Sequence, residues 1–343
     1  MNEATEKNEF TPVNFAIVVP CYHEQEVLPQ THRRLTTLLA SLEDDGTISK
    51  DSRIYFVDDG SKDETWPIIS DLARQDSNVV GIQLSRNCGH QNALLAGLFV
   101  AEGNAVVSID ADLQDDIDVI PEMLNCYREG HDVVYGVRAQ RDTDTAFKRG
   151  TAALYYKLLG ALGVNAIPNH ADYRLLSRRA IESLRSFKEV NLFLRGLVPM
   201  LGFSTTSVYY DRKERLAGET KYPFHRMLSL AIDGVTSFSA VPLRVIAALG
   251  MIIFVMTIGL TFWVLWTRFF TDQVVPGWAS SVLPIYFLGG IQLLSLGVVG
   301  EYVAKIYLET KCRPRYLIRE IVGASHPEMR APKYERASTV PQA

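Results

Sequence analysis

Cysteine is scarce in this sequence, and its few copies form no metal-binding or disulfide pattern. None of Cys21, Cys88, Cys126 and Cys312 lies at a C-x-x-C spacing, so we expect no zinc site, no thioredoxin-type site and no disulfide scaffold. An excess of basic residues is also missing, because the formal net charge is −4. The composition therefore gives no support to a nucleic-acid partner.

Charged residues are absent from two segments in the second half of the chain, residues 245–267 and 282–300. A helix over the first segment would be roughly 34 Å long, and the second segment is just long enough to cross a bilayer. Either segment alone is also compatible with a buried core helix. Because only a short loop separates them, the sequence predicts a transmembrane hairpin with helices at 243–268 and 280–303.

Basic residues flank this hairpin on its outer sides: Lys213, Arg215, Lys221, Arg226 and Arg244 before it, and Lys305, Lys311, Arg313, Arg315 and Arg319 after it. The connecting loop offers only Arg268, so the positive-inside rule predicts that both flanking regions are cytoplasmic. Residues 221–240 are predicted as an interfacial amphipathic helix, although an ordinary packing helix fits the pattern equally. Residues 1–12 are expected to be disordered and do not have the pattern of a signal peptide. Residues 304–343 are expected to form a tail that is largely disordered at its end.

Short apolar runs alternate with helical patterns through the first half of the chain. The predicted strands are 15–19, 54–57, 79–84, 105–109 and 133–135, and the predicted helices are 25–42, 64–75, 91–101 and 119–129. This alternation predicts an α/β fold with a mostly parallel sheet and helices on both faces. In such folds the ligand binds outside the carboxyl ends of the strands. Residues 148–208 are predicted as mixed helix and irregular chain.

The strongest chemical signal is Asp110-Ala111-Asp112-Leu113-Gln114, directly after a predicted strand. Two carboxylates that flank one small residue can share a divalent cation, and hard oxygen ligands favour Mg²⁺ or Mn²⁺. Such a cation can bridge the diphosphate of a nucleotide-sugar. The D-x-D pattern alone also arises by chance in surface loops, but its position after an apolar strand favours the metal site.

Three further polar motifs also follow predicted strands. In the segment from Val57 to Thr65, a turn and a helix cap explain Gly60, Ser61 and Asp63, but not Asp59. The other two motifs are Val19-Pro20-Cys21-Tyr22-His23-Glu24-Gln25-Glu26 and Ser85-Arg86-Asn87-Cys88-Gly89-His90-Gln91-Asn92. Taken alone, the first of these is better explained as a strand-to-helix turn, and His90 as a structural residue at a helix start.

The four motifs together, in this order on consecutive strand ends, resemble the family 2 inverting glycosyltransferases with a GT-A fold. Four other segments are similar to the polyprenyl-phosphate branch of that family, which includes dolichol-phosphate mannose synthases and bactoprenol glucosyltransferases. They are Gly136-Val137-Arg138, Phe147-Lys148-Arg149, Asp172-Tyr173-Arg174-Leu175 and Arg215-Leu216-Ala217-Gly218-Glu219-Thr220-Lys221-Tyr222. The resemblance covers about residues 15–319 and implies a GT-A domain at 13–220, ahead of the interfacial helix and the hairpin.

The resemblance also implies roles for individual residues. The nucleotide pocket would comprise Pro20, Tyr22, Glu24, Val57, Asp59, Asp110 and Ala111. Mg²⁺ or Mn²⁺ would be held by Asp110, Asp112 and Gln114. The phosphate groups would be bound by Arg138, Arg149, Arg215 and Lys221. The alternative explanation for each of these side chains is a solvated charge on the surface.

Three residues carry the expected catalysis, namely Asp172, Asp112 and Arg138. Asp172 resembles the proposed base near the acceptor. A phosphate monoester is already largely anionic at neutral pH, because its second pKa is about 6. Asp172 can therefore orient a substrate instead, or pair with Arg174.

The implied activity is inverting transfer of a hexose from a UDP-sugar to undecaprenyl or another polyprenyl phosphate at the bacterial inner membrane. The product would be a β-linked lipid-phosphate sugar used in cell-envelope glycan modification, with glucose the first choice and N-acetylglucosamine the second. Tetramers occur among relatives, so a homo-oligomer is a possible assembly. Two alternatives are a processive polysaccharide synthase, whose Q-x-x-R-W motif is missing here, and a non-catalytic nucleotide-binding scaffold or sensor.

A few positions depart from the family pattern. His23 stands where many relatives carry Asn, Asp115-Asp116-Ile117 replaces a common proline-containing stretch, and Tyr173 replaces a frequent Phe. None of these changes removes an expected metal or phosphate ligand. They leave the sugar specificity more open than the activity class.

Overall fold

The computed structural model describes residues 11–138, 170–190, 192, 194–211, 241–270 and 278–323. These residues divide into two compact units, of which one contains all the strands and the other contains the two long C-terminal helices. The predicted interfacial helix at 221–240 and the ends at 1–10 and 324–343 lie outside the described residues.

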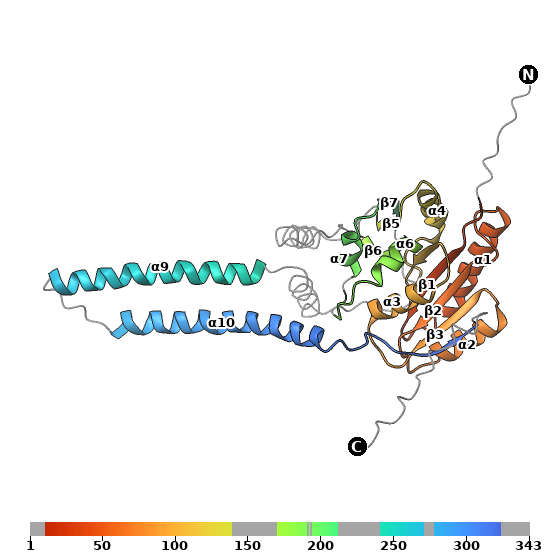
Figure 1. Cartoon of the computed structure of the whole chain (residues 1–343). Helices are drawn as coiled ribbons and strands as arrows, with labels where there is room; N and C mark the ends of the chain where they lie inside the picture. Colours follow the sequence, from red (N-terminus) through yellow and green to blue (C-terminus); the bar gives the residue numbers. More distant parts are fainter. Residues whose placement is uncertain are drawn as a thin grey trace, which may run out of the picture. The chain divides into compact units, whose positions relative to one another are not determined.

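The first unit is built on an eight-stranded sheet with the order β7-β5-β6-β4-β1-β2-β3-β8 (Figure 1). The strands are β1 Phe15–Cys21, β2 Arg53–Asp58, β3 Val79–Leu84, β4 Ala105–Ser108, β5 Val133–Arg138, β6 His170–Ser177, β7 Thr205–Tyr210 and β8 Ile318–Val322. Its helices are α1 Leu28–Asp44, α2 Thr65–Gln75, α3 His90–Val100, the 3-10 turn η1 Ile117–Val119, α4 Ile120–Arg128, α6 Arg178–Leu184 and α7 Leu194–Met200. The predicted strands and helices of the first half are confirmed, with bounds that shift by a few residues.

The central strands are continuous apolar runs because helices cover both of their faces. Ile17 belongs to the same apolar cluster as Leu35 of α1, whereas the neighbouring Val18 packs against Gly97 of α3 on the opposite face. A Cβ atom at Gly97 would lie 2.4 Å from Val18 Cγ1, so only glycine lets α3 approach β1 this closely. The close approach fixes the N-terminus of α3, which begins at His90.

The sheet is mixed, which corrects the prediction of a mostly parallel sheet. Strands β4, β1, β2 and β3 are parallel neighbours, but β6 runs antiparallel to both β4 and β5, and β8 runs antiparallel to β3. Sequence patterns missed β6 because it buries Asp172 and Arg174 and therefore does not resemble an apolar strand. Its reversed direction brings its N-terminal residues to the carboxyl end of β4, where Ser108 lies opposite Arg174.

The chain returns to the sheet after its last long helix. Residues 318–322, which fall in the predicted tail, form the edge strand β8 and pair with β3 from Gly81↔Val322 to Leu84↔Ile318. The backbone amide of Ser85 continues this contact by donating to Leu317 O at 2.8 Å. The tail is thus part of the same sheet as the predicted motifs.

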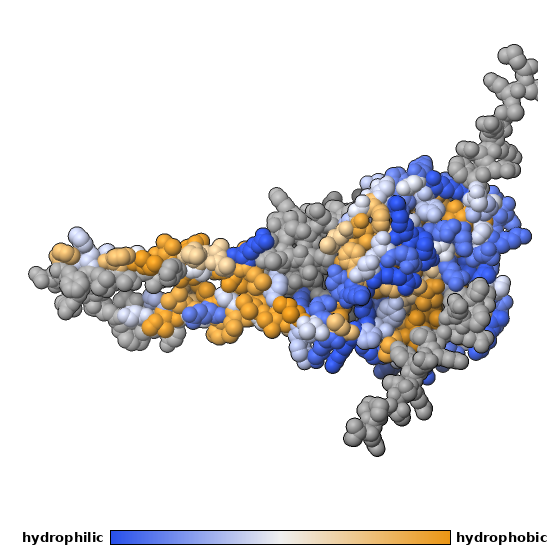
Figure 2. Space-filling view, viewed as in Figure 1, coloured by the Kyte–Doolittle hydropathy of each residue, from blue (hydrophilic) through white to orange (hydrophobic). Residues whose placement is uncertain are grey.

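The second unit consists of α9 Val241–Phe270 and α10 Trp278–Thr310, which lie alongside each other (Figure 1). Within the described residues one stretch, Phe287–Thr310 of α10, is long and apolar enough to cross a membrane, and Leu243–Ile253 of α9 is a shorter apolar stretch. Large apolar side chains are exposed on both helices, among them Trp263 and Leu293 (Figure 2). One candidate span is therefore found, and the second helix of the predicted hairpin stays a prediction.

Gly60 provides a test of how tightly the loop after β2 is packed. Its backbone is left-handed, with φ of 70°, and a Cβ atom there would lie 2.6 Å from the backbone of Arg86 and Asn87. Gly46 is also left-handed, with φ of 73°, but its Cβ would meet no atom within 4 Å. We expect Gly46→Ala to cost about 1–2 kcal/mol for the backbone conformation alone. Gly60→Ala should cost a further 1–3 kcal/mol or so, because the added methyl group overpacks the loop.

Melting temperatures of the two purified variants in detergent measure this difference. Gly60→Ala should melt at a clearly lower temperature than Gly46→Ala. Equal melting temperatures would show that the loop after β3 moves aside at little cost.

Candidate active site

The loops after β1 and β2 are fastened to each other at the carboxyl edge of the sheet. Pro20 and Val57 are register partners in the two parallel strands. Beyond them, the amide of His23 donates to Ser61 Oγ at 3.1 Å, and the amide of Glu24 donates to Thr65 Oγ1 at 2.9 Å. These contacts bring together the residues predicted for the nucleotide pocket from both loops.

Asp59 ties the loop after β2 to the loop after β3. Its carboxylate accepts hydrogen bonds from the amides of Cys88 and Gly89, at 2.7 and 2.9 Å, and it is almost fully buried. Burial raises the pKa of Asp59, although these two hydrogen bonds oppose the shift. A carboxylate has further lone pairs, so this anchoring role leaves the predicted nucleotide contact possible.

Two residues at this edge adopt left-handed backbone conformations that are uncommon outside glycine. They are His23, with φ of 58°, and Leu113, with φ of 46°. Histidine is one of the residues enriched in this region of backbone space, so His23 is compatible with the turn. Leu113 is held there by burial of its side chain. Such conformations persist where packing enforces them, and they cluster at functional sites.

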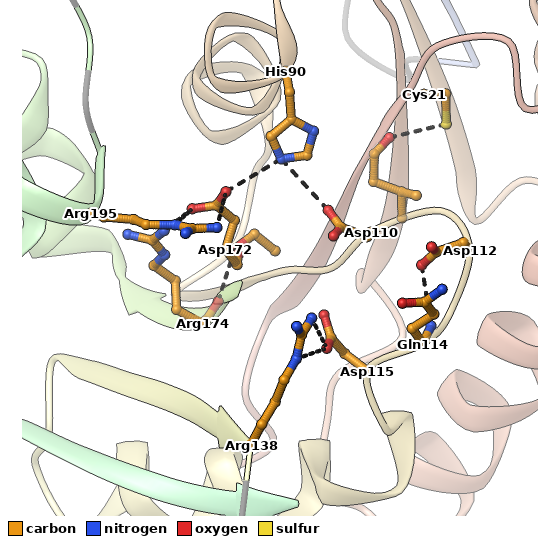
Figure 3. Close-up of polar contacts among 12 residues, drawn as sticks. Cys21, His90, Asp110, Asp112, Gln114, Asp115, Arg138, Asp172, Arg174 and Arg195 are labelled. Atoms are coloured by element: carbon orange, nitrogen blue, oxygen red, sulfur yellow. Dashed lines mark hydrogen bonds and ion pairs between the residues drawn. The ribbon is translucent and has the colours of Figure 1, made fainter. Parts of the chain in front are cut away.

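Leu113 lies within the turn from Asp110 to Gln114, which is fixed at three points. The Leu113 amide donates to Asp110 O at 3.2 Å, and the Gln114 amide donates to Asp112 Oδ1 at 3.2 Å. From α1, Thr31 Oγ1 donates to Ala111 O at 2.6 Å. The predicted metal ligands therefore share one rigid turn at the end of β4, where Figure 3 shows Asp112 and Gln114 together and Asp110 facing His90.

Negative charge is concentrated around Asp110. Burial raises the pKa of Asp110 to about 6; His90 opposes this shift, and the nearby carboxylates Asp115, Asp172 and Asp112 add to it. Within the described residues no group of three or more His, Cys, Asp or Glu side chains is arranged as a ready metal site. Two carboxylates and an amide oxygen nevertheless fit Mg²⁺ or Mn²⁺, and a cation would relieve the carboxylate repulsion that adds to this shift.

Arg138 pairs with one of the surrounding carboxylates. Its Nη2 lies 3.0 Å and its Nε 3.3 Å from Asp115 Oδ1, and Tyr210 Oη donates to the same oxygen at 2.5 Å. The buried Asp115 thus fixes the direction of the Arg138 guanidinium, which remains about a quarter exposed. The sequence identified Arg138, but it did not reveal that Asp115 orients the guanidinium or that Tyr210 donates a hydrogen bond to Asp115.

Asp172 lies beside two arginines and a histidine (Figure 3). Arg174 Nη2 donates to its Oδ1 at 2.5 Å, Arg195 donates to both oxygens at 3.3 Å, and His90 Nε2 lies 3.6 Å from Oδ2. Burial disfavours the ionised carboxylate, but Arg174 and Arg195 outweigh it and hold the pKa of Asp172 well below its usual range. The expected pairing of Asp172 with Arg174 is therefore present.

His90 and Arg195 were not among the predicted site residues. His90 Nε2 also lies 3.6 Å from Asp110 Oδ1, so this histidine stands between the two carboxylates. Arg195 is flanked in α7 by the buried Leu194, Gly196 and Leu197, and a lone charge in such an apolar context was the signal that could have revealed it. The predicted phosphate ligands Arg149, Arg215 and Lys221 lie outside the described residues.

Comparison with known proteins supports the family suggested by the motifs. Residues 16–185 match the sequence profile described as glycosyl transferase family 2. The uncharacterized glycosyltransferase YkoT of Bacillus subtilis (strain 168) is 48% identical over 308 residues, which cover 88% of this chain and 90% of that protein. The bactoprenol glucosyl transferase of Shigella phage SfX is 40% identical over 310 residues, which cover 90% and 99% of the two chains.

Among solved structures, glucosyl-3-phosphoglycerate synthase from Mycobacterium tuberculosis superposes with a TM-score of 0.45 at 16% identity, over 65% of this chain and 78% of that one. A similarity of this size carries no conclusion about ligands. The identities of 48% and 40% over most of both chains do establish the family. The chain belongs to glycosyl transferase family 2 and is a glycosyltransferase.

Proposed function

We propose that this glycosyltransferase moves glucose from UDP-glucose to a polyprenyl phosphate, with inversion at the anomeric carbon. The observation that carries the proposal is the meeting of an acidic turn, Asp110–Gln114, with the arginine-lined Asp172 at one edge of the sheet. The name of the Shigella phage relative, bactoprenol glucosyl transferase, supports both the sugar and the lipid acceptor. N-acetylglucosamine is the second choice of sugar.

The metal would be held by Asp110, Asp112 and Gln114, with Mg²⁺ or Mn²⁺ as the ion. When bound, a divalent cation supplies positive charge to the diphosphate of the leaving nucleotide. The protein's own contribution is to hold these oxygen ligands on a turn that Leu113 and Thr31 keep rigid. Pro20, Tyr22, Glu24, Val57, Asp59 and Ala111 would surround the nucleotide.

The acceptor oxygen needs alignment more than it needs a base. A phosphate monoester is largely dianionic at neutral pH, because its second pKa is about 6. Asp172 is a weak proton acceptor, since its arginine neighbours hold its pKa below the usual range. Positioning and charge screening by fixed cations are therefore the larger contributions to the rate. Arg138, Arg149, Arg215 and Lys221 are the proposed cations of the phosphate groups.

The path of the chain supports two membrane crossings. Strand β7 precedes α9 in the sequence, β8 follows α10, and both strands belong to one sheet. A chain that leaves a domain and returns to it must cross a membrane an even number of times. If α10 crosses through Phe287–Thr310, then α9 supplies the second crossing. The basic residues outside the pair support a cytoplasmic position of the sheet under the positive-inside rule.

Asp112→Asn tests the proposed chemistry, with Asp118→Asn as a matched control. Asp118 is an exposed carboxylate six positions farther along the chain, outside the turn. We expect Asp112→Asn to lower lipid-linked transfer at least about 100-fold, the size found when one group that stabilises developing charge is removed. Transfer of radiolabel from UDP-glucose into organic-extractable lipid is the measurement.

Asp118→Asn should transfer at the wild-type rate, and both variants should keep the wild-type melting temperature. Near-normal transfer by Asp112→Asn would overturn the metal assignment. If the wild type bound UDP but transferred no sugar to any polyprenyl phosphate, the proposed function itself would be wrong.

Cysteine labelling tests the two crossings. Asp272→Cys places a thiol between α9 and α10, and the native Cys312 provides one just after α10. The other cysteines are replaced by serine. A membrane-impermeant maleimide that reaches the outer face of the inner membrane should then label position 272. Cys312 should react only after the inner membrane is permeabilised. Protection of both positions until permeabilisation would show that the helices do not cross.

A further inference from the structure

Two arginines, Arg174 and Arg195, pair with Asp172, and they differ in how far they are exposed. Arg174 is buried, with only 2% of its side chain exposed, and it pairs with Asp172 Oδ1 at 2.5 Å. The same guanidinium donates to Leu194 O at 3.3 Å. Arg174 therefore pairs with Asp172 from the interior of the fold.

Arg195 contacts Asp172 from the other side and is exposed to solvent. Its side chain is 40% exposed, and its contacts to the two carboxylate oxygens are 3.3 Å long. A guanidinium presents its N–H donors in a planar fork, and the two contacts with Asp172 fix the orientation of that fork. Arg195 thus combines a fixed orientation with a solvent-facing cationic edge, the arrangement that binds phosphate well.

The position of Arg195 relative to the turn from Asp110 to Gln114 indicates which phosphate group it would bind. His90 Nε2 is 3.6 Å from Asp110 Oδ1 and 3.6 Å from Asp172 Oδ2, so these two oxygens are separated by no more than twice that distance. In Figure 3, Arg195 and Asp112 lie on opposite sides of His90 and Asp110. Inverting displacement requires the nucleophile to attack opposite the leaving group, so a diphosphate near Asp112 would leave the side of Arg195 for the acceptor phosphate.

We propose that Arg195 binds the phosphate group of the acceptor, and that Asp172 is a positioning residue that holds Arg195 in place. The inference rests on the proposed function and adds a residue to its acceptor site. In the reaction, an oxygen of the acceptor phosphate forms the bond to the anomeric carbon while the bond to UDP breaks. UDP leaves with the bonding electrons, and Arg195 takes no proton from either partner.

Arg195→Ala is the primary test, and Arg179→Ala is its matched control. Arg179 is another exposed arginine that pairs with a buried aspartate, Asp132, but in a different cluster with Ser177. The measurement is KM for undecaprenyl phosphate and for UDP-glucose in mixed micelles. We expect Arg195→Ala to raise the acceptor KM about 10-fold or more, the effect of losing hydrogen bonds to a charged group, with the donor KM within about twofold.

Arg195→Lys should recover part of the acceptor affinity because it restores the charge without the fork, and Arg179→Ala should behave as the wild type. An unchanged acceptor KM in Arg195→Ala would overturn the inference. An equal rise in the donor KM would also overturn it, because the bound phosphate would then belong to the nucleotide. Normal wild-type transfer alongside either result would leave the proposed function standing.

Asp172→Asn separates positioning from base catalysis. If Asp172 acts through Arg195, this variant should raise the acceptor KM, and combining it with Arg195→Ala should add little further. If Asp172 were a base, Asp172→Asn would lower kcat at saturating substrates with both KM values unchanged, which would overturn the positioning role. UDP affinity, measured by calorimetry, checks that the variants are folded.

Discussion

The gathering of four carboxylates in a small part of the fold is the constraint on which the rest of the site depends. Asp110, Asp112, Asp115 and Asp172 gather at the carboxyl edge of the sheet, and three of them contribute to the pKa shift of the fourth, Asp110. Side chains of the protein neutralise two members of the group: Arg138 pairs with Asp115, while Arg174 and Arg195 pair with Asp172. The other two, Asp110 and Asp112, lie on the turn after β4 and are the proposed ligands of an added cation, and His90 lies 3.6 Å from Asp110.

The mixed topology of the sheet makes this arrangement possible. In a purely parallel sheet, every strand delivers only its last residues to the ligand edge. Because β6 runs the other way between β4 and β5, it delivers its first residues, including Asp172, to that edge. The buried Arg174 two residues later then pairs with Asp172 from within the sheet. A single reversed strand thus places an acidic and a basic group beside the turn that holds Asp110.

The sequence predicted those parts of the structure whose signal is local. The apolar runs of β1 to β4, the turn at Gly60 and the D-x-D turn were all found, because burial and turn geometry leave a pattern over a few neighbouring residues. Strand β6 was missed because its polar residues are paired inside the fold, and β8 because it is short, mixes apolar with charged residues and lies in a segment predicted as a tail. Nothing local to Asp115 or Arg195 reveals a partner 23 positions away in the sequence. Such contacts follow from the packing of the whole sheet.

The central claim is that Asp110 and Asp112 are the proposed ligands of a cation, while arginines pair with Asp115 and Asp172. Titration of Mn²⁺ in the presence of UDP, followed by electron paramagnetic resonance, tests this most directly. The account predicts that Asp110→Asn abolishes tight Mn²⁺ binding, whereas Asp132→Asn, which alters the ion pair of a buried aspartate in a different cluster, leaves it unchanged. Equal Mn²⁺ affinity in the wild type and in Asp110→Asn would contradict it.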